Sequence, residues 1–217
     1  MARTRTAAYD DQRELILAQA AALFARQGYT AASMNQVAAA CGISKPTLYH
    51  YVQDKHELLL LVAQAHIDRL QAVVAEVEAQ ALGPRERLQT LIERFVLAYA
   101  DAQHEHRVLT EDVKFLDEAA RERVLDGERR VVAAFARAVV ALRPELAGAS
   151  LATPLTMLLF GMINWMFTWL KPDGALSHAA MAPVVVDLFL GGLGAVQVPR
   201  QPTKATKSIK SKKETVA

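Results

Sequence analysis

The hydrophobic positions of this chain recur at helical spacing over most of its length. Before the glycine at position 28, for example, the apolar residues Ile16, Ala20, Leu23 and Phe24 fall on one face of a helix. Long runs that alternate apolar and polar residues, as half-buried strands do, are missing from the sequence. We therefore predict an all-α fold. The predicted helices cover residues 10–29, 33–42, 44–52, 54–80, 84–102, 104–116, 118–142, 150–170 and 178–196.

The short segments 33–42 and 44–52 fit the pattern of a helix-turn-helix unit. Ala38 is small where the two helices would cross, and Gly42 supplies a left-handed turn residue. A unit of this kind places its second helix in the major groove of DNA. The apolar residues that would hold the unit together are Val37, Ile43 and Leu48, packed against Leu23 and Phe24.

The polar residues of the second short segment are candidates for contact with DNA. Lys45 and Thr47 lie in its N-terminal part, where a lysine can reach guanine acceptors and a threonine methyl can meet that of thymine. Tyr49 and His50 suit phosphate oxygens, although core packing is the alternative for Tyr49 and, more strongly, for Tyr51. Helix N-termini also attract phosphate through their N–H groups. The DNA-binding candidates are Ser33, Ser44, Lys45, Thr47, Tyr49, His50 and Lys55.

The stretch GYTAASMNQVAAACGISKPTLYHYVQDKHELL, residues 28–59, resembles the DNA-binding head of the TetR (tetracycline-repressor-like) family. The shared pattern runs from a Gly-aromatic pair through a Ser-capped helix to Ser-x-x-Thr-Leu-Tyr and then Lys-x-x-Leu. The chain departs from it at Ala32, which would remove one phosphate contact, and at Pro46 and Val52. The other predicted helices follow the nine-helix order of that family. The matching positions are Gly28, Tyr29, Ser33, Val37, Ala38, Gly42, Ser44, Thr47, Leu48, Tyr49, Lys55 and Leu58.

The resemblance implies a homodimer whose last two helices, about 150–170 and 178–196, pair with those of the partner in a four-helix bundle. It also implies a ligand pocket in each body and a repressor that leaves a near-palindromic double-stranded DNA operator when a small molecule binds. The sequence supports a buried bundle independently, because residues 146–170 hold no charge and residues 181–196 hold only Asp187. A membrane-anchored helical protein is the distant alternative for such a stretch.

Charge and composition divide the chain into three parts. We predict a DNA-binding domain over residues 1–55, a ligand-binding and dimerisation domain over 56–198, and a disordered basic tail over 199–217. Residues 61–198 carry a net charge of −4, whereas the tail carries +5. The tail could add salt-sensitive attraction to DNA, and a merely solubilising terminus is the alternative.

The segment GMINWMFTWLKPDG, residues 161–174, supplies the ligand-binding candidates Asn164, Trp165 and Trp169. The alternative is that both tryptophans belong to the core or interface of the bundle. With VLTEDVKFLD, residues 108–117, the segment is similar to TetR members that answer to acyl-CoA thioesters of fatty-acid, steroid-ring or aromatic-acid breakdown. A repressor that senses lipophilic drugs is the second possibility. The basic residues near enough in sequence to meet a CoA phosphate are Arg94, Arg107, Lys114 and Arg137.

Neither an enzyme nor a metal or cofactor site is indicated. His104 and His106 are two positions apart and diverge on a helix, and no phosphate-binding glycine loop or serine elbow is present. Cys41 is the single cysteine, so an intrachain disulfide is impossible. The charged N-terminal stretch has no signal-type apolar core, and we expect a cytoplasmic protein.

Overall fold

A computed structural model describes residues 2–170 and 174–198 of the 217-residue chain. Within these ranges the chain is helical and has no strand, which confirms the predicted all-α fold. The predicted tail 199–217 lies outside the described residues. The helices are α1 (Ala2–Gln27), α2 (Met34–Ala40), α3 (Lys45–Leu48), α4 (Lys55–Glu78), α5 (Pro84–Asp101), α6 (Gln103–Glu111), the 3-10 helix η1 (Val113–Phe115), α7 (Glu118–Leu142), α8 (Glu145–Gly148), α9 (Ala152–Asn164), α10 (Met166–Trp169) and α11 (His178–Ala195).

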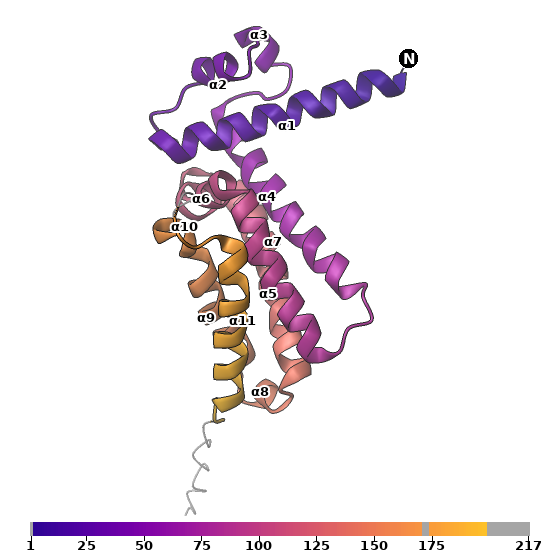
Figure 1. Ribbon diagram of the computed structural model, residues 1–217. Coiled ribbons are helices and arrows are strands. Elements are labelled where there is room, and N and C mark those ends of the chain that lie inside the picture. The colour runs from indigo at the N-terminus through magenta and orange to yellow at the C-terminus, as the bar shows by residue number, and fades with distance from the viewer. Residues whose placement is uncertain (1, 171–173, 199–217) are drawn as a thin grey trace, which may run out of the picture.

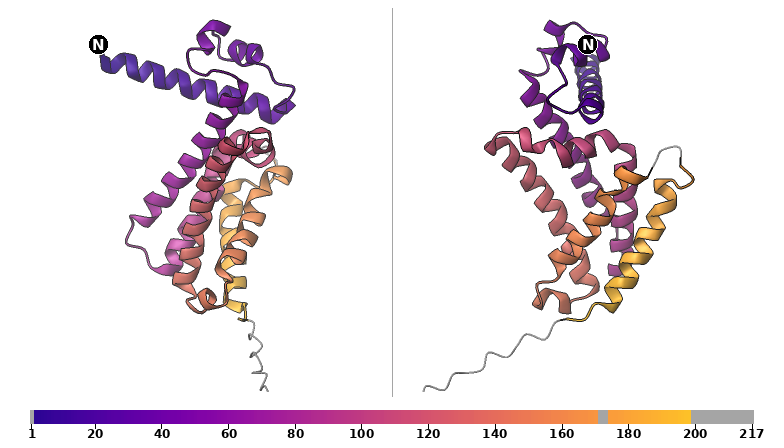
Figure 2. Two further views of the ribbon diagram at one scale, coloured as in Figure 1. Left: turned by 180° about the vertical axis from the view of Figure 1, so that it is seen from behind. Right: turned by 90° about the vertical axis from the view of Figure 1, so that its left-hand side faces the viewer.

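The helices form a small head and an elongated body (Figure 1). Helices α1, α2 and α3 make up the head, and α1 lies across the top of the body, where it packs on α6 and α4. Helix α4 starts in the head and runs down the body beside α5 and α7. Helices α9 and α11 lie along the other side of the body, as the two views of Figure 2 show. Helix α4 is therefore the element that joins the two parts.

Capping residues define the two short helices of the head. Ser33 and Gln36 form a reciprocal capping box at the start of α2, in which the Ser33 hydroxyl accepts from the Gln36 N–H. Helix α2 ends at Ala40, and Gly42 two residues later has a φ of +66°, in the left-handed region that glycine adopts without strain. Ser44 then caps α3, with Pro46 in the first turn. The structure thus confirms Ser33 and Ser44 as N-caps and Gly42 as the left-handed turn residue.

Several predicted boundaries were wrong. The first helix begins at Ala2, well before residue 10. The regular part of the second short helix ends at Leu48, because residues 49–51 turn so that Val52 is buried before Asp54 caps α4. The predicted helix 104–116 ends at Glu111 and continues as η1, and an extra short helix, α8, precedes α9.

The predicted helix 150–170 is also interrupted, at Trp165. Helix α9 ends at Asn164, and α10 turns so that Met166 and Leu170 enter the core while Trp165 and Trp169 stay at the surface. The uncharged stretch that suggested a membrane span therefore contains a helix of only 13 residues. By length and composition alone, α4 and α11 could cross a membrane. This is weak evidence, because core helices meet the same criterion and both pack here against other helices of the body.

One close helix crossing sets the position of α4 in the body. Gly127 of α7 is buried against Ile67 of α4, and a Cβ atom at Gly127 would lie 2.3 Å from the Ile67 Cγ2 atom. The Gln71 amide also donates a hydrogen bond of 3.4 Å to the Gly127 carbonyl oxygen. The missing side chain at Gly127 is thus what allows α4 and α7 to approach this closely.

Candidate DNA-binding surface and effector cavity

The head presents one polar face of α3 to solvent. Leu48 is fully buried against the head core, whereas Ser44, Lys45, Tyr49 and His50 are exposed. The Lys45 Nζ atom lies 6.0 Å from the centre of the Tyr49 ring, so the two side chains share one surface. The structure therefore brings these four candidates together, and Tyr49, which is 43% exposed, is not a core aromatic.

The other head candidates are placed differently. The Thr47 hydroxyl is half-buried and lies 2.7 Å from the Ser44 hydroxyl, while Ser33 is exposed as the cap of α2. The Lys55 Nζ atom instead donates to the carbonyl oxygens of Tyr29 at 3.0 Å and Ala32 at 3.0 Å. The Lys55 ammonium thus holds the start of α4 to the loop before α2.

Aromatic and polar contacts join the head to the body. The Tyr29 and Phe115 rings stack with their centres 5.3 Å apart, and the Lys55 Nζ atom lies 4.5 Å from the Tyr29 ring centre. Below this stack, the Asp117 N–H donates to the His56 Nε2 atom at 3.0 Å. The segment from α6 to the start of α7 therefore touches the head directly.

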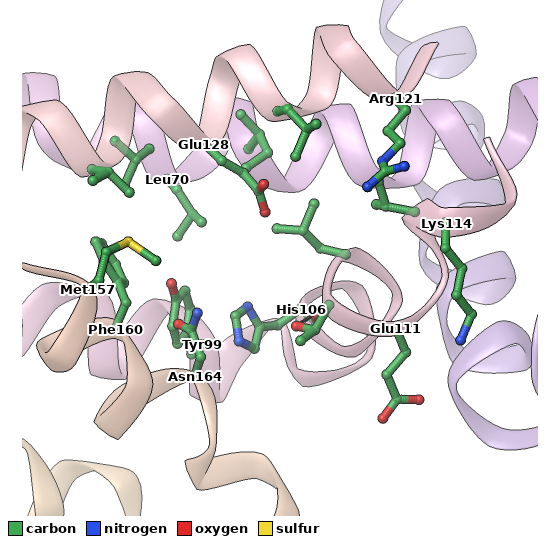
Figure 3. A pocket seen from close by; sticks show the side chains of 17 residues that line it. Leu70, Tyr99, His106, Glu111, Lys114, Arg121, Glu128, Met157, Phe160 and Asn164 are labelled. Carbon is green, nitrogen blue, oxygen red and sulfur yellow. Dashed lines mark hydrogen bonds between the residues drawn. The ribbon is translucent and has the colours of Figure 1, made fainter. Parts of the chain in front are cut away.

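The same segment forms one wall of a cavity in the body. The cavity has a volume of about 590 Å³ and lies between α4, α5, α6, α7 and α9 (Figure 3). Leu70, Met157 and Phe160 line one end, and Lys114 and Arg121 line the opposite end. A cavity of this size and mixed lining is typical of a small-molecule site.

Polar groups line the middle of the cavity. His106 is buried; its ring stacks on that of Tyr99 with 3.8 Å between centres, and its Nδ1 atom lies 3.4 Å from the Nε2 atom of His66. Among the described residues, the Asn164 Oδ1 atom has no hydrogen-bond partner. Buried polar atoms of this kind normally find a partner, which here a ligand could supply.

Burial sets the protonation states of these groups. Desolvation lowers the pKa of His106 to about 4, and desolvation together with the charges of His106 and Arg69 lowers that of His66 to about 3. Both imidazoles are therefore neutral at pH 7. Burial raises the pKa of the Tyr99 hydroxyl far above its ordinary value, with the Glu128 charge adding to the effect, so Tyr99 remains a hydrogen-bond donor.

Only one of the three ligand residues predicted from the sequence lines the cavity. Asn164 lines it, whereas Trp165 and Trp169 are 63% and 50% exposed and do not. Of the basic candidates, only Lys114 is a lining residue. Five residues were not predicted from the sequence because they come from four separate helices and carry no sequence motif: Tyr99, His106, Glu128, Arg121 and the His66 that supports His106.

The outer faces of α9 and α11 carry exposed apolar side chains. Leu158 of α9 is 66% exposed and Leu188 of α11 is 64% exposed, and Met162 and Val184 on the same two helices are also exposed. Scattered exposed apolar residues are common, but several on two neighbouring helices indicate an interaction surface.

A helix-turn-helix head with an exposed polar helix, joined to an all-α body that holds a cavity, is the arrangement of a ligand-binding transcriptional regulator. Comparison with known proteins makes the assignment specific. Residues 16–62 match the family described as bacterial regulatory proteins, tetR family, and residues 81–193 match the tetracyclin repressor-like C-terminal domain. The chain belongs to the TetR family of transcriptional regulators, which are generally not enzymes.

Two related regulators match this chain over different lengths. The transcriptional activator FasR of Mycolicibacterium smegmatis is 37% identical over 86 residues, which are 40% of this chain and 39% of FasR. The repressor KstR2 of the same species is 27% identical over 84% of this chain and 90% of KstR2. The match thus spans well under two thirds of FasR.

Solved structures share the fold over most of their length. A TetR-family regulator from Bordetella parapertussis is 36% identical, with a TM-score of 0.78, and covers 85% of this chain and 97% of its own. AibR, solved with isovaleryl coenzyme A and operator DNA, is 26% identical, with a TM-score of 0.70, over 82% of this chain and 97% of its own.

Proposed function

We propose that the protein is a repressor that binds a near-palindromic operator as a homodimer and leaves it when an acyl-CoA thioester enters the body. The observation that carries this proposal is the cavity, which is apolar at one end, polar in the middle and basic at the other end. A cytoplasmic location follows from this role. The head would correspond to residues 1–55 and the body to 56–198.

The exposed face of α3 supports contact with DNA. In this proposal the exposed Lys45 contacts base edges, and the exposed Tyr49 and His50 donate to phosphate. Ser33, Ser44 and Thr47 would add contacts through their hydroxyls or through the helix N-termini that they cap. Because Lys55 binds loop carbonyls, we assign its contribution to the position of α4 and not to a phosphate contact.

Fluorescence anisotropy with the DNA upstream of the protein's own gene tests this placement. Lys45→Ala should lower the preference for operator over random DNA, whereas Tyr49→Phe should weaken binding to both alike. Arg85→Ala is the matched control, because Arg85 is an exposed cation at the start of α5, far from the head. Unchanged binding by both head variants would show that α3 is not the recognition helix.

The apolar outer faces of α9 and α11 support the proposed dimer. In a four-helix bundle with a second copy, Leu158, Leu188 and the exposed Trp165 would be covered by the partner's equivalent helices. A two-fold dimer presents two recognition helices to two half-sites, which requires a near-palindromic operator.

The lining of the cavity supports a thioester effector. Leu70, Met157 and Phe160 suit an acyl chain or ring, and Lys114 and Arg121 suit the phosphates of coenzyme A. AibR, the solved relative named above, binds isovaleryl coenzyme A. The binding signal would reach the head through α6, which lines the cavity and packs on α1, and through η1, whose Phe115 stacks on Tyr29.

A sensor of lipophilic cations is the second candidate, favoured by the Glu128 carboxylate beside the aromatic Tyr99 and Phe160. Thermal-shift screening separates the two candidates with isovaleryl-CoA, octanoyl-CoA, benzoyl-CoA, the matching free acids and the cation tetraphenylphosphonium. We expect stabilisation by a thioester, which should also release the operator DNA. Stabilisation by the cation alone would establish the second candidate in place of the first.

A further inference from the structure

A carboxylate side chain lies in the middle of the cavity. Glu128 reaches into it from α7 and faces Tyr99 and His106 (Figure 3). Among the described residues, no lysine, arginine or histidine lies within ion-pairing distance of the Glu128 carboxylate. Burial raises the pKa of this carboxyl group, and the charge of the neighbouring Arg129, which pairs with Glu122 and Asp126 outside the cavity lining, opposes that increase only in part.

The other groups of the middle region do not supply a positive charge. His106 is a neutral imidazole held against His66, and Tyr99 is a neutral hydroxyl. The cavity's cations, Lys114 and Arg121, lie at its opposite end from Leu70, Met157 and Phe160. The remaining acid of the lining, Glu111, points away from Glu128 and pairs with Arg107 at 3.1 Å.

We propose that the middle region holds the thioester group of the effector, and that Glu128 is the residue that excludes the corresponding free acid. The inference rests on the proposed function, because it assumes that an acyl thioester occupies this cavity. A thioester carbonyl is neutral and can accept a hydrogen bond from the Tyr99 hydroxyl. An amide N–H of the pantetheine arm can donate to Glu128 or to the unpartnered Asn164 oxygen.

A free carboxylate in the same position would meet the Glu128 charge with no cation between them. Two like charges a few ångströms apart in a partly desolvated site repel strongly, whereas a neutral carbonyl carries no such cost. In Figure 3, Glu128 lies between the apolar end with Phe160 and Leu70 and the end with Lys114 and Arg121. The carboxylate of an acid bound at the apolar end therefore faces Glu128 before it faces either cation. The regulator therefore responds to an acid after its ligation to coenzyme A and not before.

Isothermal titration calorimetry at pH 7.5 tests the inference with three ligand pairs: isovaleryl-CoA and isovalerate, octanoyl-CoA and octanoate, benzoyl-CoA and benzoate. For the pair whose thioester binds best, the unmodified protein should bind the thioester at least about tenfold more tightly than the acid. Glu128→Gln keeps the shape and hydrogen-bonding capacity of the side chain without its charge. This change should improve binding of the free acid about tenfold or more and alter thioester binding less than about threefold.

Glu111→Gln is the matched control, because it removes one negative charge from the lining but not from the middle region. It should leave the ratio of thioester to acid affinity unchanged. If the free acid binds the unmodified protein and Glu128→Gln with equal affinity, the role of Glu128 is overturned, although thioester binding stands. The same holds if Glu111→Gln improves binding of the free acid as much as Glu128→Gln does. Failure of every thioester to bind either protein overturns both this inference and the proposed function.

Discussion

The contact between Gly127 and Ile67 predicts that a single added methyl group will move α4. In Gly127→Ala, the new Cβ atom would stand 2.3 Å from the Ile67 Cγ2 atom, far inside contact distance. The clashing methyl belongs to a β-branched side chain, whose χ1 angle is nearly fixed in a helix, so it cannot swing aside easily. Relief therefore requires α4 and α7 to separate.

Two opposing effects set the size of the change in stability. Alanine in place of glycine inside a helix stabilises by up to about 1 kcal/mol, while overpacking of a tight contact typically costs about 1–3 kcal/mol. We expect Gly127→Ala to lower the free energy of unfolding by up to about 2 kcal/mol. Because α4 begins in the head, the same displacement should also weaken binding to operator DNA.

Urea unfolding followed by circular dichroism, at one fixed protein concentration, measures the effect. Gly194→Ala is the control, since Gly194 lies in α11 with open space around its Cβ position, and it should be neutral or slightly stabilising. In the double variant Gly127→Ala/Ile67→Ala, the clashing methyl is gone. Its loss of stability should be smaller than the sum of the single losses by about 1–3 kcal/mol. Additive losses, or a Gly127→Ala protein as stable as the original, would refute the reasoning.

Three further predictions concern the buried histidines, the head and the dimer. The folded-state pKa values of His66 and His106, about 3 and about 4, lie below the value of an unfolded histidine. The unfolded chain therefore binds more protons than the folded one, and the free energy of unfolding falls as the pH drops below about 6.5. Unfolding at pH 5 should be easier than at pH 7.5 by up to about 4 kcal/mol, and His106→Gln should remove about half of this difference. Lys55→Met leaves three loop carbonyls without their hydrogen-bond donor, so it should lower the free energy of unfolding by about 1–3 kcal/mol and weaken operator binding. Lys55→Arg should recover part of both losses. A Lys55→Met protein with unchanged stability and operator binding would contradict the assigned role. Leu158→Glu should shift the protein from dimer to monomer in light scattering, while Leu15→Glu in the head should not, and a dimeric Leu158→Glu protein would place the interface elsewhere.

Local signals allowed the sequence to identify the helix-turn-helix unit of the head and its exposed side. Ser33, Gly42 and Ser44 mark helix ends through capping and backbone preferences that act over a few residues. The spacing of Val37 and Leu48 then identifies the buried side, and the polar residues between them identify the exposed side. The number and order of the long helices followed from the same periodicity.

Only the tertiary structure decided where the effector cavity lies and what lines it. Tyr99, His106 and Glu128 come from three helices, and each looks like an ordinary residue of an amphipathic helix. Periodicity shows which face of a helix is buried but not which other face it meets, so no spacing in the sequence could bring these three side chains together. The same limit explains Lys55 and Trp165, whose partners and exposure depend on packing between distant segments. The sequence by itself thus determined the class of protein, and the packing of its helices decided the chemistry of its interior.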